Sequence, residues 1–321
     1  MTRSILFLPL LIAMCLPAAW AQAQAYPARP VRLIIGQPPG AIQDVTVRLV
    51  NARLAQALGQ PVVVENRVGA NGTISANLVI KSTPDGYTLW FGNAAGVHPL
   101  FNAENSSTLG KELLPVTNVA SVPFILYTSG KLPVKTLAEL VAYAKAQPAG
   151  KLNFAPIIAQ HELLMHLLNS RTGITYTSIP YKQGGAPAIV TALISGEIDF
   201  AIAGMAGVTP HLPSNVIRAL MITSAKRAPA IPDVPTSTEL GIPNYETESN
   251  IGVAAPVGAP AEAIRRISTE LARIVRDPEI GERFRAVGIE PVGSTPEGQQ
   301  RTYDAEMKLW AEAARISNFK P

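Results

Sequence analysis

The sequence has almost no cysteine and none of the common motifs that hold a nucleotide. Its single cysteine, Cys15, lies near the start, so the rest of the 321 residues carry no thiol, disulfide or thiolate metal ligand. The patterns GxxxxGK[ST], GxGxxG and GxSxG are absent. These absences argue against a nucleotide cradle, a dinucleotide fingerprint, a serine-hydrolase elbow and a cysteine nucleophile, and we expect no catalytic residue and no cofactor.

The sequence also carries little net charge. Apart from Arg3, 26 Lys and Arg residues stand against 23 Asp and Glu residues, which leaves a net charge of +3. This surplus is too small and too dispersed to attract nucleic acid, so we expect no nucleic-acid partner. No later stretch approaches the roughly 18 uninterrupted apolar residues that a membrane helix needs.

Residues 1–25 have the three-part layout of a secretory signal. Arg3 precedes an apolar segment over residues 5–16, and small residues with Ala-x-Ala spacing follow at residues 19–25. We therefore expect this segment to be removed and the mature protein to act in the periplasm, as a monomer. Lipid attachment at Cys15 is an alternative, which the large Met14 before it disfavours.

Short β-rich runs alternate with longer segments of helical spacing. This alternation predicts an α/β fold with parallel sheets covered by helices. The Pro-rich stretch over residues 227–245 is predicted to be an ordered surface excursion, because apolar residues lie between its prolines. The β-rich runs are VRLIIG, VVVEN, YTLWFG, PFILYTS, LNFA, ITYTSIPY, EIDFAIA, IRALMIT and IGVAAP.

Two extended apolar runs, near residues 121–136 and 249–260, are flanked by Pro and Gly and followed by new helices. We predict that both cross between two lobes. Lobe 1 then contains residues 26–123 and 251–321, and lobe 2 contains residues 124–250. Ligands of open α/β sheets bind beyond the carboxyl ends of strands, so a cleft between the lobes is the expected site.

The first candidate site is the loop between a β-branched run and a helix at residues 36–44. Amide hydrogens at a helix start attract anions. We expect Asp44 to cap this helix and to pair with Arg48 one turn later. Donors to a carboxylate are then the amides around Gly40, Ala41 and Ile42, and Asp44 contacts only a ligand that also carries a cation.

Other loops have similar composition. NRVGANGTISANLVI and FGNAAGVHPLF are rich in Gly, Asn and Thr, and each alone is compatible with plain turn chemistry. NFAPIIAQHELL and IPYKQGGAPAIV begin two further helices, and Lys182 is compatible with either a ligand contact or a solvated cation. His161 and His166 are five residues apart, so they point about 140° apart on a helix and do not form a zinc site.

Several blocks of the sequence resemble one known family. They include YPARPVRLIIGQPPG, GQPVVVENRVGANGT, TPDGYTLWFGN, IPYK, SGEIDFAIAG, PDVPT, GVAAPVGAP and VGIEPVGSTPE. From about Tyr26 to Trp310 the chain is similar to the periplasmic receptors of tripartite tricarboxylate transporters, also called Bug receptors. The resemblance implies a two-lobe type II periplasmic-binding-protein fold with a hinge, which closes over a small carboxylated solute and serves membrane permease subunits.

The family holds a carboxylate with main-chain donors, small hydroxyl side chains and waters, and this sequence departs from that pattern. The second glycine of the first loop is Ala41, the usual Gly/Ser/Thr-rich loop is the apolar segment of residues 155–159, and Asn250 replaces an aromatic residue. Two isoleucines in place of hydroxyls favour an aromatic or hydrophobic monocarboxylate over citrate. The candidate ligand-binding residues are Gly40, Ala41, Ile42, Gln43, Asp44, Asn93, Ala94, Ala95, Ile158, Ala159, Gln160, Tyr181 and Asn250.

Two other functions are compatible with the same fold. A receptor of this kind can feed a sensor or regulatory partner in place of a permease, and the sequence does not separate the two. A periplasmic enzyme using the same cleft is disfavoured, because no nucleophile motif and no cluster of metal ligands is present.

Overall fold

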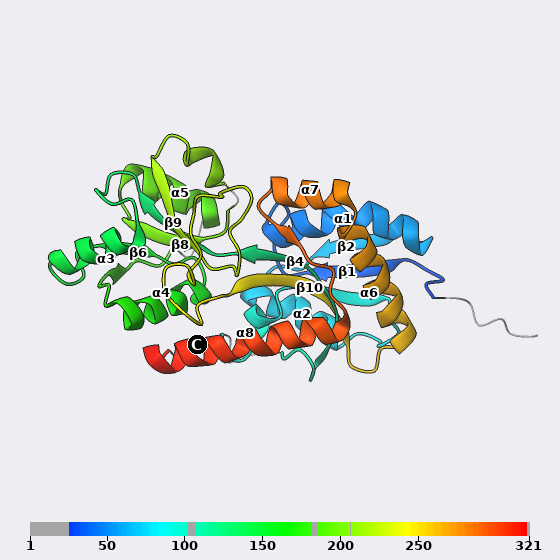
Figure 1. Ribbon diagram of the computed structural model, residues 1–321. Helices are drawn as coiled ribbons and strands as arrows, with labels where there is room; N and C mark the ends of the chain where they lie inside the picture. Colours follow the sequence, from blue (N-terminus) through cyan, green and yellow to red (C-terminus); the bar gives the residue numbers. More distant parts are fainter. Residues whose placement is uncertain (1–25, 102–106, 182–184, 206, 320–321) are drawn as a thin grey trace, which may run out of the picture.

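The structure is a computed structural model that describes residues 26–101, 107–181, 185–205 and 207–319. The segment predicted to be a secretory signal and Lys182 lie outside these residues. The described chain forms two α/β lobes, each built on one sheet, which lie side by side in Figure 1. None of its helices is long and apolar enough to cross a membrane.

The described helices are α1 (Ile42–Leu58), α2 (Thr73–Ile80), α3 (Leu137–Ala146), α4 (Ala159–Thr172), α5 (Gly185–Ser195), α6 (Ala261–Val275), α7 (Pro278–Ala286) and α8 (Pro296–Ser317). The strands are β1 (Val31–Ile35), β2 (Val62–Asn66), β3 (Thr88–Gly92), β4 (Leu113–Pro123), β5 (Ile125–Ser129), β6 (Asn153–Ala155), β7 (Thr177–Ser178), β8 (Phe200–Ala203), β9 (Ile217–Ile222), β10 (Glu248–Pro256) and β11 (Glu290–Pro291). Short 3-10 turns are η1 (Ala70–Gly72), η2 (Ala95–Val97) and η3 (Thr209–His211).

The first lobe is built on a six-stranded sheet in the order β11-β4-β10-β3-β1-β2. Strand β1 is parallel to β2 and β3, and apart from Arg32 its side chains are buried, on both faces of the sheet. Leu33 packs with α1 and α6 on one face, and Ile34 packs with α2 on the other. The prediction of parallel sheets is wrong for the other half, because β10 pairs antiparallel with both β3 and β4.

The second lobe is built on a five-stranded sheet in the order β7-β6-β8-β5-β9. Here too the sheet is mixed, because β5 pairs antiparallel with β8 and β9 while β6 is parallel to β7 and β8. Helices α3 and α4 cover one face and α5 covers the other. The Pro-rich stretch is ordered as predicted, with Ile231 and Val234 buried in the core beside α5.

The chain passes between the sheets at two places that are tied together. Strand β4 ends at Pro123 and β5 begins at Ile125, so the first passage is centred on Phe124. The hydroxyl of Thr223, after β9, donates to the carbonyl oxygen of Thr247 (2.5 Å) and accepts a hydrogen bond from the Phe124 amide (3.0 Å). Thr247 precedes β10, which returns the chain to the first sheet. Pairing with β4 places residues 248–250 in the first sheet, although the sequence assigns them to lobe 2.

Helix α8 belongs to both lobes, whereas the sequence assigns it to lobe 1 alone. Near its start, the Gln299 side chain accepts a hydrogen bond from the Val116 amide of β4 (2.8 Å). Near its end, Trp310 and Ala313 are buried in the core that contains α3 and α4 of the second lobe. Figure 1 shows α8, in red, running beneath both lobes.

Candidate functional site

A cavity of about 820 Å³ lies between the lobes. The first lobe contributes the loops after β1, β2 and β3 and the start of β10, and the second lobe contributes the loop between β6 and α4 and Pro180. Residue for residue, the lining is Gly36, Gln37, Ile42, Gln43, Val68, Gly69, Ala70, Asn71, Gly72, Trp90, Asn93, Gly96, Phe101, Pro156, Ile157, Ile158, Ala159, Gln160, Glu162, Pro180, Ser249, Ile251 and Phe319.

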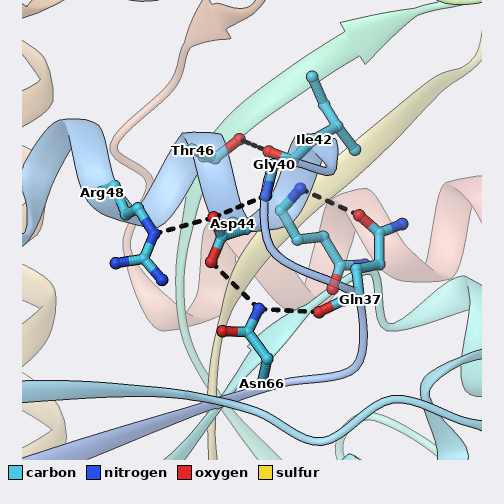
Figure 2. A network of polar contacts seen from close by, with 8 residues as sticks. Gln37, Gly40, Ile42, Asp44, Thr46, Arg48 and Asn66 are labelled. Carbon is cyan, nitrogen blue, oxygen red and sulfur yellow. Dashed lines mark hydrogen bonds and ion pairs between the residues drawn. The ribbon is translucent and has the colours of Figure 1, made fainter.

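The loop before α1 is held by a network of polar contacts around Asp44, shown in Figure 2. This buried carboxylate accepts hydrogen bonds from the Gly40 amide (3.0 Å), the Arg48 guanidinium (2.8 Å) and the Asn66 side chain (3.1 Å). The bond from Arg48 and those from Gly40 and Asn66 lower the pKa of the Asp44 carboxyl to about 2. The predicted ion pair of Asp44 with Arg48 is therefore confirmed, whereas the predicted helix cap is not, because the backbone amide that Asp44 accepts from, Gly40, precedes α1.

Several backbone amides that we expected to bind the ligand are instead hydrogen-bonded within this loop. The Gly40 amide is bonded to Asp44, the Ala41 amide donates to the Pro38 carbonyl (3.2 Å), and the Gln43 amide donates to the Gln37 side chain (3.1 Å). Gly40, Ala41 and Asp44 do not line the cavity, in contrast to what the sequence predicts. Ile42 and Gln43 do line it, so this loop presents the start of α1 rather than its glycine turn.

A second loop of the first lobe reaches the cavity through residues 68–72, which the list of candidate residues omits. Gly69, Ala70, Asn71 and Gly72 all have positive φ, which turns the backbone toward the cavity between β2 and α2. At Gly36 a Cβ atom would lie 2.5 Å from the Gly72 Cα, so the two loops pack backbone against backbone. The sequence feature that could have identified this loop is the Gly-x-x-Gly spacing that follows a β-strand.

Asn93 links the end of β3 to the rest of the first-lobe wall. Its side chain accepts a hydrogen bond from the Gly96 amide (3.0 Å) and donates one to the Ser249 hydroxyl (2.7 Å). Both partners line the cavity. Ala94 and Ala95 are buried in the core beneath this loop and do not line the cavity, whereas Asn93 and Gly96 do.

The second-lobe wall is mostly apolar. Ile157 and Ile158 line it, and Ile158 remains 41% exposed just before α4. Ala159 and Gln160 line the cavity at the start of α4. Ala159 contributes only a methyl group. Gln160 is 7% exposed, and its side-chain amide lies near Gly96 of the opposite lobe. The structure therefore places three predicted residues of this wall, Ile158, Ala159 and Gln160, at the cavity.

Two neighbouring residues hold this wall without lining it. The ring of His161 accepts a hydrogen bond from the Ile157 amide (3.4 Å), and complete burial lowers the pKa of the imidazole to about 3. Tyr181 does not line the cavity, in contrast to the sequence-based prediction, and its hydroxyl donates to Glu197 (2.5 Å). No group of three His, Asp or Glu residues within the described ranges is arranged to hold a metal ion.

Asn250 also faces away from the cavity, in contrast to the sequence-based prediction. Side chains alternate along a strand, so Ser249 and Ile251 line the cavity while Asn250 points to the opposite face of β10. There it donates a hydrogen bond to Glu306 of α8 (3.2 Å), whose other oxygen accepts from Trp310 (3.1 Å). Burial raises the pKa of the Glu306 carboxyl to about 7.

Comparisons with known proteins agree with this architecture. The family model described as "Tripartite tricarboxylate transporter family receptor" matches residues 46–315. The protein BugT of Bordetella pertussis is 36% identical over all of this chain and 99% of its own length. A solved structure of Rpa4515 from R. palustris with adipate is 31% identical, has a TM-score of 0.80, and is matched over 92% of this chain and 99% of that one.

A second solved structure, MatC from Rhodopseudomonas palustris with bound malate, is 26% identical with a TM-score of 0.74, and the match covers 90% of this chain and 99% of that one. The chain therefore belongs to the receptor family of the tripartite tricarboxylate transporters. The predicted family and the two-lobe periplasmic-binding-protein fold are confirmed.

Proposed function

We propose that this protein is a periplasmic receptor that binds a small carboxylate in the interlobe cavity and delivers it to a tripartite permease. Support comes from the family, from the carboxylates held by the relatives named above, and from the position of the cavity between two hinged sheets. Contacts to both lobes would shift the protein from an open to a closed arrangement.

The first lobe is the side on which we place the carboxylate. Its wall carries the side-chain amides of Gln37, Gln43, Asn71 and Asn93, and helices α1 and α2 both begin there. The Gln37 side chain already accepts from the Gln43 amide of α1, and the N-cap residues of both helices, Ala41 and Gly72, add no side-chain cap. Amide groups at a helix start favour an anion by about 0.3 to 1 kcal/mol each in exposed positions, so tight binding needs several donors together.

The ligand that we propose is an aromatic or hydrophobic monocarboxylate. The observation that carries this choice is the mostly apolar second-lobe wall, where Pro156, Ile157, Ile158 and Pro180 line the cavity. Phe101 and Phe319 add aromatic surface, with ring centres 6.4 Å apart. Burying apolar ligand surface there contributes about 25 cal/mol per Å². A ligand that is charged on all sides would gain no binding free energy from this apolar surface.

A thermal-shift screen of the mature protein tests the ligand class. Phenylacetate, benzoate and hexanoate are compared with citrate, and isothermal titration gives Kd for each compound that raises Tm. A ligand at 100 times its Kd stabilises the folded state by about 2.7 kcal/mol. We expect the monocarboxylates to raise Tm and citrate to leave it unchanged. Stabilisation by citrate alone would contradict the proposed ligand class.

Uptake measurements separate transport from sensing. Cells that lack this receptor should lose uptake of the labelled ligand and regain it when the receptor is restored. Unchanged uptake in such cells, with binding intact in the purified protein, would point to a regulatory partner. The same protein should return the ligand chemically unaltered after long incubation, because we propose binding without turnover.

A further inference from the structure

The cavity has an unusual electrostatic composition for a site that receives an anion. Among the described residues that line it there is no Lys, Arg or His, and Glu162 is the one ionisable side chain. Glu162 lies in the first turn of α4, on the second-lobe wall beside Ile158. The proposed carboxylate donors lie on the opposite wall, so the two ends of a bound ligand meet different charges.

Neighbouring groups fix the position of Glu162. One carboxylate oxygen accepts a hydrogen bond from the Ser178 hydroxyl (2.6 Å), and the other lies 3.5 Å from the His166 ring nitrogen. The side chain is only 20% exposed.

The comparison with Asp44 clarifies why this charge matters. Asp44 also lies in the first turn of a helix, but the Arg48 guanidinium neutralises it at 2.8 Å and it lies outside the cavity. Glu162 lines the cavity, and the described residues give it no Lys or Arg partner. Its negative charge also uses the favourable field at the α4 start, which would otherwise attract an anion.

We infer that Glu162 is a specificity-determining residue that rejects ligands with a second carboxylate. This inference rests on the proposed carboxylate binding in the cavity. A dicarboxylate anchored on the first lobe would bring its other charge to a wall that holds a like charge and two isoleucines. Like charges close together in a site of low polarity disfavour binding, and the apolar surroundings solvate neither of them.

Three six-carbon acids that differ only at the far end test the inference by isothermal titration. Hexanoate ends in a methyl group, adipate in a carboxylate and 6-aminohexanoate in an ammonium group. For the unaltered protein at pH 7.5 we expect adipate to bind more weakly than the other two by a factor of roughly ten or more. Equal or tighter binding of adipate would overturn the inference without any variant being needed.

The variant Glu162→Gln keeps an acceptor for Ser178 and removes the charge. We expect it to narrow the gap between adipate and 6-aminohexanoate by a factor of roughly ten or more, since both ligands feel the same lost charge with opposite sign. Glu162→Asp keeps the charge and should preserve the rejection of adipate. Asp233→Asn removes an exposed charge of the same lobe outside the cavity and should leave the ratio unchanged.

The outcomes separate this inference from the proposed function. If monocarboxylates bind and Glu162→Gln leaves the adipate ratio unchanged, Glu162 does not set the specificity, although carboxylate binding stands. If Asp233→Asn changes the ratio as much as Glu162→Gln does, the effect comes from net charge and the inference is wrong. If none of the acids binds the folded protein, the proposed function fails and the inference fails with it.

Discussion

The two walls of the cavity use their polar groups in different ways. On the first lobe, loops with positive φ and side-chain amides turn toward the cavity, and Gly36 lets two of these loops pack backbone against backbone. On the second lobe, Pro156, Ile157, Ile158 and Pro180 present apolar surface, and the one ionisable lining residue in the part of the chain that the structure describes is the acidic Glu162. The difference suggests that one lobe recognises an anion by donation while the other selects the rest of the ligand by shape and repulsion.

The largest expected effect comes from breaking the first-lobe wall with Gly36→Ala. The added methyl carbon would lie 2.5 Å from the Gly72 Cα, which is backbone and does not yield easily. Overpacking of this kind costs about 1–3 kcal/mol. Urea unfolding should show this loss, together with weaker ligand binding. Gly96→Ala is the matched control for stability, because its Cβ would meet only the side chains of Gln160 and Asn93, at 3.8 and 3.9 Å. Equal stability of the two variants would contradict the close approach.

A second prediction concerns the support behind the first wall, where Asn250 and Glu306 meet. The folded protein raises the pKa of Glu306 from 4.5 to about 7, so it binds a proton that the unfolded chain releases. The resulting stability is fully present below pH 4.5 and is lost as the pH rises through 7. Glu306→Gln should flatten the fall in unfolding free energy between pH 5 and 8 by an amount on the order of 1–3 kcal/mol.

The informative measurement is how the unfolding free energy changes with pH, not its absolute value. Glu306→Gln also loses a hydrogen-bond acceptor worth about 1 kcal/mol, and this loss is the same at every pH. Burial raises the pKa of Glu248 as well, so some slope of the same sign should remain. A variant whose stability falls with pH as steeply as that of the unaltered protein would show that Glu306 is ionised in the fold.

The smallest effect is expected on the second wall, from Ile158→Ser. This side chain is 41% exposed without a ligand, and Ile158 is the N-cap residue of α4, so the variant loses little burial, gains a hydroxyl that can cap the helix, and should keep or slightly raise Tm. A ligand that covers it would lose apolar contact of about 1 kcal/mol, and Kd for phenylacetate should rise roughly fivefold. Val257→Ser, at a residue 52% exposed and outside the cavity, is the control for surface polarity. Unchanged phenylacetate affinity would remove the second wall from ligand selection.

The sequence predicts the broad fold well, because β-branched runs and helical spacing report burial directly. It misses strand β4, the longest in the structure as described, because Pro115 and Pro123 are typical of loops. Pro115 is accommodated where the pairing register of β4 and β10 shifts, so the sheet tolerates a residue without an amide hydrogen there. Such a shift depends on the partner strand, which the local sequence does not reveal.

The candidate site is predicted in part. Asn93, Ile158, Ala159 and Gln160 line the cavity as expected because helices or strand ends place them there. The prediction is wrong for the lining role of Gly40 and Ala41, since the amides that would serve a ligand are bonded within the loop. It is also wrong for Asn250, because a shift of one residue along a strand reverses the face.

Helix α8 sets a limit on how far the receptor can open. Its beginning is fixed to β4 by Gln299, while Trp310, Ala313 and Ala314 near its end are buried with α4. A wide separation of the two halves would pull these side chains into water, at a cost that grows by about 25 cal/mol for each Å² uncovered. Small rotations that leave this contact closed therefore cost less free energy than a wide separation of the two halves.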